Sequence, residues 1–215
     1  MRIVFLGPPG AGKGTQAQRL AAAYGAHHIS TGELIRAAMA SRSPLGEKAR
    51  PYIEEGLLVP DDLACELAES ALAEFEYDRF VLDGFPRTLT QAMWLDARLQ
   101  QQHKPLQVVL NLVVPDEAII ERLSRRRVHK LTGENYHLDY NPPPPDVDSA
   151  LIAQRPDDHP EAIRHRLEVY RATHELLEQY YQKQGLLVEI DGLGTMEEVF
   201  QRLVNVLKQH GILNA

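Results

Sequence analysis

The feature that most constrains this chain is a glycine-rich loop near the N-terminus, between an apolar run and an amphipathic segment. The loop is GPPGAGKGT, residues 7–15, and it follows the run Ile3-Val4-Phe5-Leu6. An uninterrupted apolar run is typical of a parallel strand buried on both faces. After the loop, Ala17, Leu20 and Ala21 recur at helical spacing. This order predicts a phosphate-binding loop, because curled glycine backbone directs N–H groups at an anion and the helix N-terminus adds positive potential.

The loop departs from the usual phosphate-loop pattern at one position. The pattern G-x-x-x-x-G-K is complete, but Gly14 stands where a Ser or Thr usually follows the lysine, and Thr15 comes one residue later. A switch GTPase is not favoured, because no guanine-reading N-K-x-D occurs in the chain. The D-x-x-G at residues 191–194 lies too near the C-terminus for a switch.

Strand-like runs and helical periods alternate along most of the chain. Further apolar runs occupy residues 80–82, 108–114 and 186–190, and an amphipathic pattern covers residues 199–207. Such alternation predicts right-handed βαβ crossovers and an α/β fold with helices on both faces of a parallel sheet.

Two stretches break this alternation. Residues 30–59 read as helix upon helix with no strand, beginning with the capping-box pattern Ser30-Thr31-Gly32-Glu33. Residues 125–158 lack periodicity and contain four consecutive prolines, which exclude a helix interior or a central strand there. A connection of that length is a functional lid or is disordered, and its Tyr, Leu and Arg content favours a lid of short strands.

The positive charge is concentrated in arginine. There are 17 arginines and 6 lysines in a chain of net charge −7, with one arginine cluster at residues 122–127 and another at residues 155–166. Either cluster alone is compatible with a solvated helix face. The forked guanidinium group suits phosphate oxygens, however, and two clusters in an acidic chain indicate small phosphorylated ligands rather than a nucleic-acid coat.

A second motif, DGFPR at residues 83–87, directly follows the apolar run 80–82. Ligands in open α/β sheets bind beyond the carboxyl ends of the strands. Asp83 could there hold the water shell of a magnesium ion, and Arg87 could take a phosphate. Taken alone, the motif is also compatible with a simple turn.

In combination, the motifs resemble those of adenylate kinases of the long-lid bacterial type, in order and spacing, over essentially the whole chain. They are residues 7–15, Ser30-Thr31-Gly32, DGFPRT with Gln91, Arg126-Arg127-Val128-His129, Arg155-Pro156-Asp157-Asp158 and Arg164-His165-Arg166-Leu167. The resemblance implies a P-loop three-layer fold with a central five-stranded parallel sheet, a helical AMP-binding insertion and a small β lid. The expected core is residues 1–29, 60–124 and 159–215, with the AMP-binding insertion at 30–59 and the lid at 125–158.

The resemblance implies transfer of the terminal phosphoryl group of Mg-ATP to AMP, giving two ADP. The residues that match ATP-binding positions are Gly10, Ala11, Gly12, Lys13, Gly14, Thr15, Arg126, Asn135, Tyr136 and Gly194. Those that match AMP-binding positions are Thr31, Arg36, Leu57, Leu58, Val59, Gly84, Phe85, Pro86, Arg87, Gln91, Arg155 and Arg166. Catalytic roles fall to Lys13, Asp83, Arg87, Arg122, Arg126, Arg155 and Arg166, with Asp83 acting through magnesium-bound water. Both insertions are expected to close over the substrates, since water must be excluded from phosphoryl transfer.

Some bacterial relatives hold the lid with four cysteines and zinc, whereas this chain contains only Cys65. The matching positions are His129, Thr132, Asp146 and Ser149, with Asp148 as a competing register for the second pair. The resemblance is therefore to a metal-free lid held by polar hydrogen bonds, and no zinc is expected.

Three other functions fit parts of this pattern. A kinase of CMP, UMP or GMP shares the fold, but Thr31, Gln91 and the long lid match the adenylate type. A regulatory protein that binds ATP without transfer would not need Asp83 together with the arginines, and a structural interaction domain leaves them unexplained. With no secretory leader or membrane-length apolar run, a single cysteine and no sustained heptad seam, the chain is expected to be a cytoplasmic monomer without nucleic-acid or membrane partners.

Overall fold

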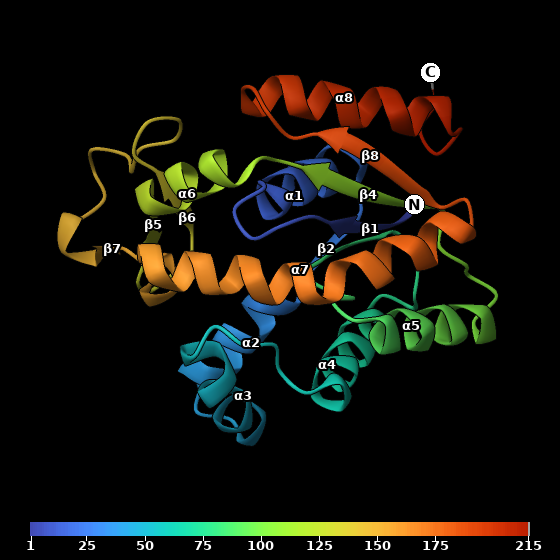
Figure 1. Ribbon diagram of the computed structural model, residues 1–215, viewed down its shortest axis with the longest axis horizontal. Coiled ribbons are helices and arrows are strands. Elements are labelled where there is room, and N and C mark those ends of the chain that lie inside the picture. The colour runs from blue at the N-terminus through green and yellow to red at the C-terminus, as the bar shows by residue number, and fades with distance from the viewer. Residues whose placement is uncertain (215) are drawn as a thin grey trace.

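The computed structural model describes residues 1–214, and its strands and helices alternate along most of the chain (Figure 1). The strands are β1 (Arg2–Leu6), β2 (His27–Ser30), β3 (Phe80–Asp83), β4 (Val108–Val113), β5 (Arg126–His129), β6 (Asn135–His137), β7 (Ile152–Ala153) and β8 (Leu187–Asp191). The α-helices are α1 (Lys13–Tyr24), α2 (Thr31–Ala40), α3 (Pro44–Glu54), α4 (Asp61–Glu74), α5 (Leu89–Gln101), α6 (Asp116–Arg125), α7 (Pro160–Lys183) and α8 (Met196–Gln209). Short 3-10 turns occupy Ser149–Leu151 and Pro156–Asp158.

Five parallel strands form the central sheet in the order β2-β3-β1-β4-β8. Successive residues of β1 alternate between its two faces. Val4 and Leu6 pack in the apolar cluster that includes α4, α5 and the later part of α7, whereas Ile3 and Phe5 pack in the cluster that includes α1 and α8. The strand therefore has no solvated face, as its unbroken apolar run predicts, and the predicted three-layer α/β fold with a five-stranded parallel sheet is confirmed.

The edge strand β2 is the one strand of this sheet that the sequence pattern did not indicate. Its four residues are HHIS, and only Ile29 and Ser30 are buried, so there is no apolar run to detect. The expectation of a helical stretch from Ser30 is nearly right. Ser30 ends the strand and also caps α2, since its side chain accepts the N–H of Glu33 at 3.4 Å.

The two interruptions of the alternation project from the core (Figure 1). Helices α2 and α3 pack against each other below α7 in this view, and α4 leads back to the sheet. The other interruption contains a small antiparallel sheet in the order β6-β5-β7, so short strands are present as predicted. None of the helices within residues 1–214 combines the length and apolar character that crossing a bilayer requires.

Candidate functional site

The glycine loop joins β1 to α1 at the carboxyl end of the central sheet. Its tight course requires glycine at Gly7 and Gly10, whose φ angles are +132° and +83°. A Cβ on Gly7 would lie 2.6 Å from the carbonyl oxygen of Leu112, and one on Gly10 would lie 2.7 Å from Cγ of Leu123. No side chain of the described residues caps the first turn of α1. The N–H groups of that turn are therefore available to an anion.

Lys13 is folded back onto the loop that it follows. Its ammonium group donates to the carbonyl oxygens of Gly7 at 2.7 Å and Pro8 at 2.8 Å. The pKa of Lys13 is lowered to about 8, chiefly by burial and also by the nearby Arg87 and Arg166, while Asp83 opposes the shift. The lysine thus lies in surroundings with excess positive charge, which a bound phosphate would neutralise.

Asp83 ends β3, opposite Phe5 of β1 and Ser30 of β2 in the sheet register. A Cβ on Gly14 would lie 3.1 Å from Oδ2 of Asp83. This proximity accounts for the departure from the usual pattern, because a side chain at Gly14 would crowd the carboxylate. Nε2 of His28, which the sequence pattern did not connect with the site, lies 4.0 Å from the same oxygen.

A single carboxylate at the end of a strand fits the way proteins hold magnesium. This ion keeps several of its waters and needs only one or two carboxylates together with substrate phosphates. Within residues 1–214, no three His, Cys, Asp or Glu side chains gather as an all-protein metal site. A lone carboxylate such as Asp83 therefore fits a magnesium ion that keeps most of its waters and arrives with a phosphate.

Five arginines that are distant in the sequence come together beside Lys13. They are Arg36, Arg87, Arg126, Arg155 and Arg166. Burial lowers the pKa of Arg36, Arg87, Arg155 and Arg166, and the neighbouring guanidinium groups lower it further. For Arg155 the pKa falls to about 9, with Arg126 and Arg36 as the main neighbouring charges. Arg87 remains exposed to solvent although protein atoms surround its guanidinium group. Enclosed cations that repel one another are characteristic of a site for a polyanion.

Two aspartates partly balance this cluster. Asp158 is fully buried, and its carboxylate accepts from Nε of Arg126 at 2.7 Å and from Nη2 of the same residue at 2.5 Å. Asp157 lies 2.8 Å from Arg166. Burial opposes ionisation of Asp157, but Arg166 and Arg126 outweigh it and lower its pKa. Both aspartates belong to the motif Arg155-Pro156-Asp157-Asp158, but no role was predicted for them from the sequence. Two adjacent acidic residues so close to Arg155 could have indicated ion pairs with the arginines.

The residues expected at the second nucleotide lie next to the arginine cluster. A Cβ on Gly84, whose φ is +80°, would lie 3.0 Å from Oγ1 of Thr31 and 3.1 Å from Nη2 of Arg87. Gln91 is buried, and its Oε1 accepts the backbone N–H of Arg87 at 2.7 Å. Of the other candidates, Phe85, Pro86 and Val59 are buried, Leu58 is half-buried and Leu57 is exposed.

Some candidate residues do not point into the cluster. Arg122 donates to the carbonyl oxygen of Gly192 at 2.9 Å and to that of Ala11 at 3.5 Å, so it ties the phosphate loop to the segment after β8. Gly194, in that segment, has Glu198 as its nearest neighbour. In the small sheet, Asn135 accepts a hydrogen bond from Arg155, whereas the buried Tyr136 donates to Glu134.

The four positions matched to zinc cysteines do not form one network. Nδ1 of His129 accepts the N–H of Thr132 at 3.1 Å, within the turn between β5 and β6. Among the hydrogen bonds of residues 1–214, none joins these two residues to Asp146 or Ser149. The expected polar network is therefore present only at its first pair.

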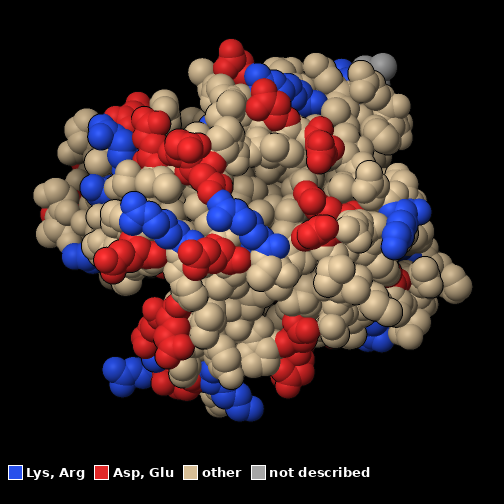
Figure 2. All heavy atoms as spheres, in the orientation of Figure 1, with Lys and Arg blue, Asp and Glu red and all other residues tan. Residues whose placement is uncertain are grey.

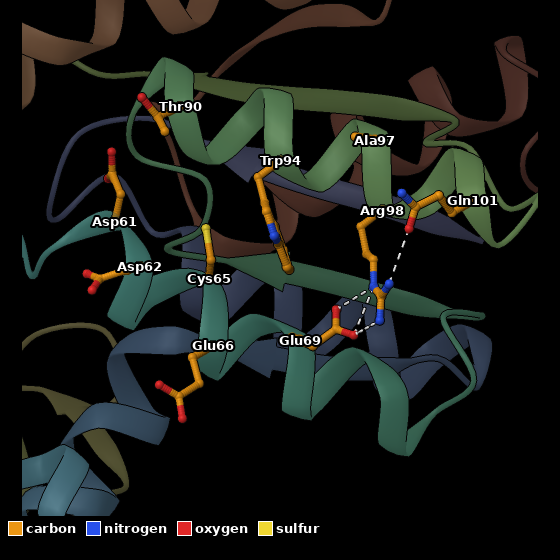
Figure 3. Close-up of a pocket in the computed structure, with 10 residues that line it drawn as sticks. All are labelled: Asp61, Asp62, Cys65, Glu66, Glu69, Thr90, Trp94, Ala97, Arg98 and Gln101. Carbon is orange, nitrogen blue, oxygen red and sulfur yellow. Dashed lines mark hydrogen bonds and ion pairs between the residues drawn. The ribbon is translucent and has the colours of Figure 1, made fainter.

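Acidic and basic side chains are interspersed over the face that α7 crosses, and no broad basic patch is visible there (Figure 2). A cavity of about 750 Å³ that none of the five clustered arginines lines lies between α4 and α5 (Figure 3). Glu69 and Arg98 pair at one end of it, and Asp61 lies at the other. The arginines that gather beside Lys13 therefore form a local cluster, with no counterpart on the face in view.

Comparison with known proteins gives a single result. The sequence model of the family described as adenylate kinase matches residues 5–186. A protein named adenylate kinase from Salinibacter ruber is 53% identical over 207 residues, which is 96% of this chain and 98% of that protein. Adenylate kinases from Carboxydothermus hydrogenoformans and Archaeoglobus fulgidus are 43% and 41% identical over 214 residues, covering 97% of this chain and 100% and 99% of those proteins.

Proposed function

The chain belongs to the adenylate kinase family, and from this premise we propose that its site transfers the terminal phosphoryl group of ATP to AMP, giving two ADP. It is accordingly a phosphotransferase of the nucleoside-monophosphate kinase type. The observation that supports this most strongly is the convergence of Lys13, Asp83 and five arginines from separate elements at one end of the sheet.

ATP would bind with its phosphates in the loop of residues 10–15, against the free N–H groups at the start of α1. Lys13 would release the carbonyl oxygens of Gly7 and Pro8 and turn to the phosphates, whose charge restores the pKa of its ammonium group. Arg126, Asn135 and Tyr136 would contact ATP from the small sheet, and Gly194 from the segment after β8. We assign Arg122 a positioning role, because its bonds to Ala11 and Gly192 join the two segments.

AMP would bind on the other side of the arginine cluster, between the insertion and the loop after β3. Its phosphate would contact Arg36 and Arg87, and its base would lie beside Gln91. Thr31, residues 57–59 and residues 84–86 would surround the nucleoside. Gly84 supports this arrangement, because it has no side chain and its backbone can approach Thr31 and Arg87 closely without filling the space that a nucleotide needs.

The chemistry requires position and positive charge more than a nucleophile. The phosphoryl group passes through a loose transition state whose charge is spread over its oxygens. Arg87, Arg126, Arg155 and Arg166 are held by the fold before reaction and would stabilise that charge. A magnesium ion bound with ATP would neutralise phosphate charge, and Asp83 would hold its water shell.

Water must be kept from the transferring group, so we propose that residues 30–59 and 125–158 close over AMP and ATP respectively, around a core of residues 1–29, 60–124 and 159–215. Fluorescent labels on the small sheet and the core should approach each other when diadenosine pentaphosphate is added. Unchanged distances would contradict closure.

A coupled assay with Mg-ATP tests the reaction itself by comparing AMP, CMP, UMP and GMP as acceptors. AMP should be preferred, and ADP should form only when an acceptor is present. Equal use of a pyrimidine nucleotide would indicate a different kinase of the same fold, and binding of ATP without transfer would indicate a regulatory protein.

We also propose that the protein acts as a monomer in the cytoplasm. A single cysteine suits a reducing compartment. Burial raises the pKa of the Cys65 thiol to about 11, so the thiol is a weak nucleophile. Light scattering at micromolar concentration should give one chain mass, and a dimer mass would contradict the proposal.

A further inference from the structure

Gln91 has both ends of its side-chain amide engaged by protein groups. Oε1 accepts the backbone N–H of Arg87 at 2.7 Å, and Nε2 donates to Oδ1 of Asp61 at 2.7 Å. Asp61 begins α4, thirty positions before Gln91 in the sequence. The same carboxylate oxygen also accepts from the hydroxyl of Thr88 at 2.9 Å, and Thr88 caps α5 by accepting the N–H of Gln91.

A carboxylate fixes the orientation of an amide in a way that a neutral partner does not. An ionised carboxylate can only accept hydrogen bonds, whereas an amide has an accepting and a donating end that exchange places when it flips. If Gln91 flipped, its oxygen would face the oxygen of Asp61, and its NH₂ group would face the N–H of Arg87. Asp61 and Arg87 together therefore allow one orientation of this side chain.

The orientation matters because the amide retains hydrogen-bonding capacity. Its oxygen has two acceptor positions and its nitrogen two donors. The protein uses one of each, which leaves one acceptor and one donor in a fixed order. The edge of adenine offers an amino donor beside the acceptor N1, whereas hypoxanthine offers an acceptor, O6, beside the donor N1–H. A fixed amide can match only one of these orders.

We propose that Asp61 is a positioning residue that sets the preference for adenine at the monophosphate site by locking the amide of Gln91. The inference rests on the proposed function, because it assumes that the base of AMP lies beside Gln91. Asp61 does not touch the substrate in this scheme. It lies at the end of the cavity between α4 and α5 (Figure 3), and it affects the choice of base through its hydrogen bond with Gln91.

The test compares AMP with IMP as acceptors in the wild-type protein and in Asp61→Asn and Asp61→Ala, at saturating Mg-ATP. Asn keeps the size of the side chain but can donate as well as accept hydrogen bonds. We therefore expect Asp61→Asn to fold and to hold the amide of Gln91 less firmly in one orientation. The ratio of kcat/KM for AMP to that for IMP should fall about fivefold in Asp61→Asn and about tenfold or more in Asp61→Ala, the scale of a lost hydrogen bond to a charged group. KM for ATP should stay within about twofold of wild type, since no ATP contact is altered.

Asp62→Asn is the matched control. Asp62 carries the same charge in the same first turn of α4, but its carboxylate bonds only to the adjacent N–H of Leu63 among its described contacts. The ratio of kcat/KM for AMP to that for IMP in Asp62→Asn should equal that of the wild type. A purely structural role for Asp61 would lower activity with both acceptors and leave their ratio unchanged, and that result would overturn the inference, as would an equal fall in the control. A wild-type protein that does not phosphorylate AMP would instead overturn the proposed function, and the inference with it.

Discussion

Removal of the Asp158 carboxylate, as in Asp158→Asn, should destabilise the free protein and strengthen its binding of anions. Asp158 is fully buried and accepts two charge-assisted hydrogen bonds from Arg126, with Arg166 a further 3.6 Å away. Hydrogen bonds to charged groups contribute about 1.5–3 kcal/mol each. The variant retains one acceptor oxygen, and both arginines are about one-fifth exposed, so water relieves part of the loss. We expect a loss of about 2–4 kcal/mol.

For a protein of this size, about 1 kcal/mol lowers Tm by about 2–4 °C, so the Tm of Asp158→Asn should lie roughly 4–16 °C below that of the wild type. Phosphate should raise Tm more in the variant than in wild type, because the arginines lack their internal counter-charge and the ligand stabilises the folded state. Asp157→Asn is the control, since Asp157 is about one-quarter exposed and pairs only with Arg166 at close range. An unchanged Tm in Asp158→Asn, or a smaller rise of its Tm with phosphate than in the wild type, would contradict the role given to this carboxylate.

Three further predictions concern the loop, the monophosphate site and the small sheet. The pKa of Lys13 in the free protein is lowered to about 8, so its ammonium form is lost as the pH rises through that value. The kcat/KM for ATP should therefore fall about tenfold per pH unit above pH 8. Lys13→Arg should remove this decline, and a decline that persists in the active variant would contradict the assignment to Lys13. Gly84→Ala places a methyl group 3.0 Å from Oγ1 of Thr31 and should raise KM for AMP about tenfold or more. Gly133→Ala is the control, because Gly133 has a similar positive φ but no atom within 4 Å of the new Cβ, so it should cost only backbone strain of about 1 kcal/mol. Equal KM values for AMP in the two variants would exclude crowding at Gly84 as the cause. Protein purified without a tag should contain no stoichiometric zinc by elemental analysis, and one equivalent per chain would contradict the expectation drawn from Cys65 and the small sheet.

The central sheet and the phosphate loop were predictable because each depends on neighbours in the sequence. The run at residues 3–6 is apolar without interruption because β1 is covered on both faces, and the glycines mark a turn that other residues cannot make. Strand β2 was not predicted, because it has no apolar run that would indicate a buried strand. It lies at the edge of the sheet, and two of its four residues are histidines, one stacked on Phe75 with ring centroids 3.8 Å apart.

The site was predictable in its cations but not in the groups that hold them. Arginine clusters and motif spacing are visible in the sequence, whereas the pairing of Arg126 with Asp158 depends on a fold that joins residues 32 positions apart. The same holds for Asp61 and Gln91, which only the packing of α4 beside α5 brings together. Arg122 shows the same dependence on the fold. The resemblance placed it with the catalytic arginines, and the structure adds that it donates to the backbone carbonyl groups of Ala11 and Gly192, which are distant from it in the sequence.

The central claim is that two nucleotides meet with their phosphates between the loop of residues 7–15 and the arginine cluster. A crystal structure with diadenosine pentaphosphate and magnesium tests it most directly. We expect one adenine beside Gln91, the other beside Gly194, and a phosphate chain that runs from the N–H groups of the loop to Arg36 and Arg87. Either adenine elsewhere, or a phosphate chain that does not contact Lys13, would contradict it.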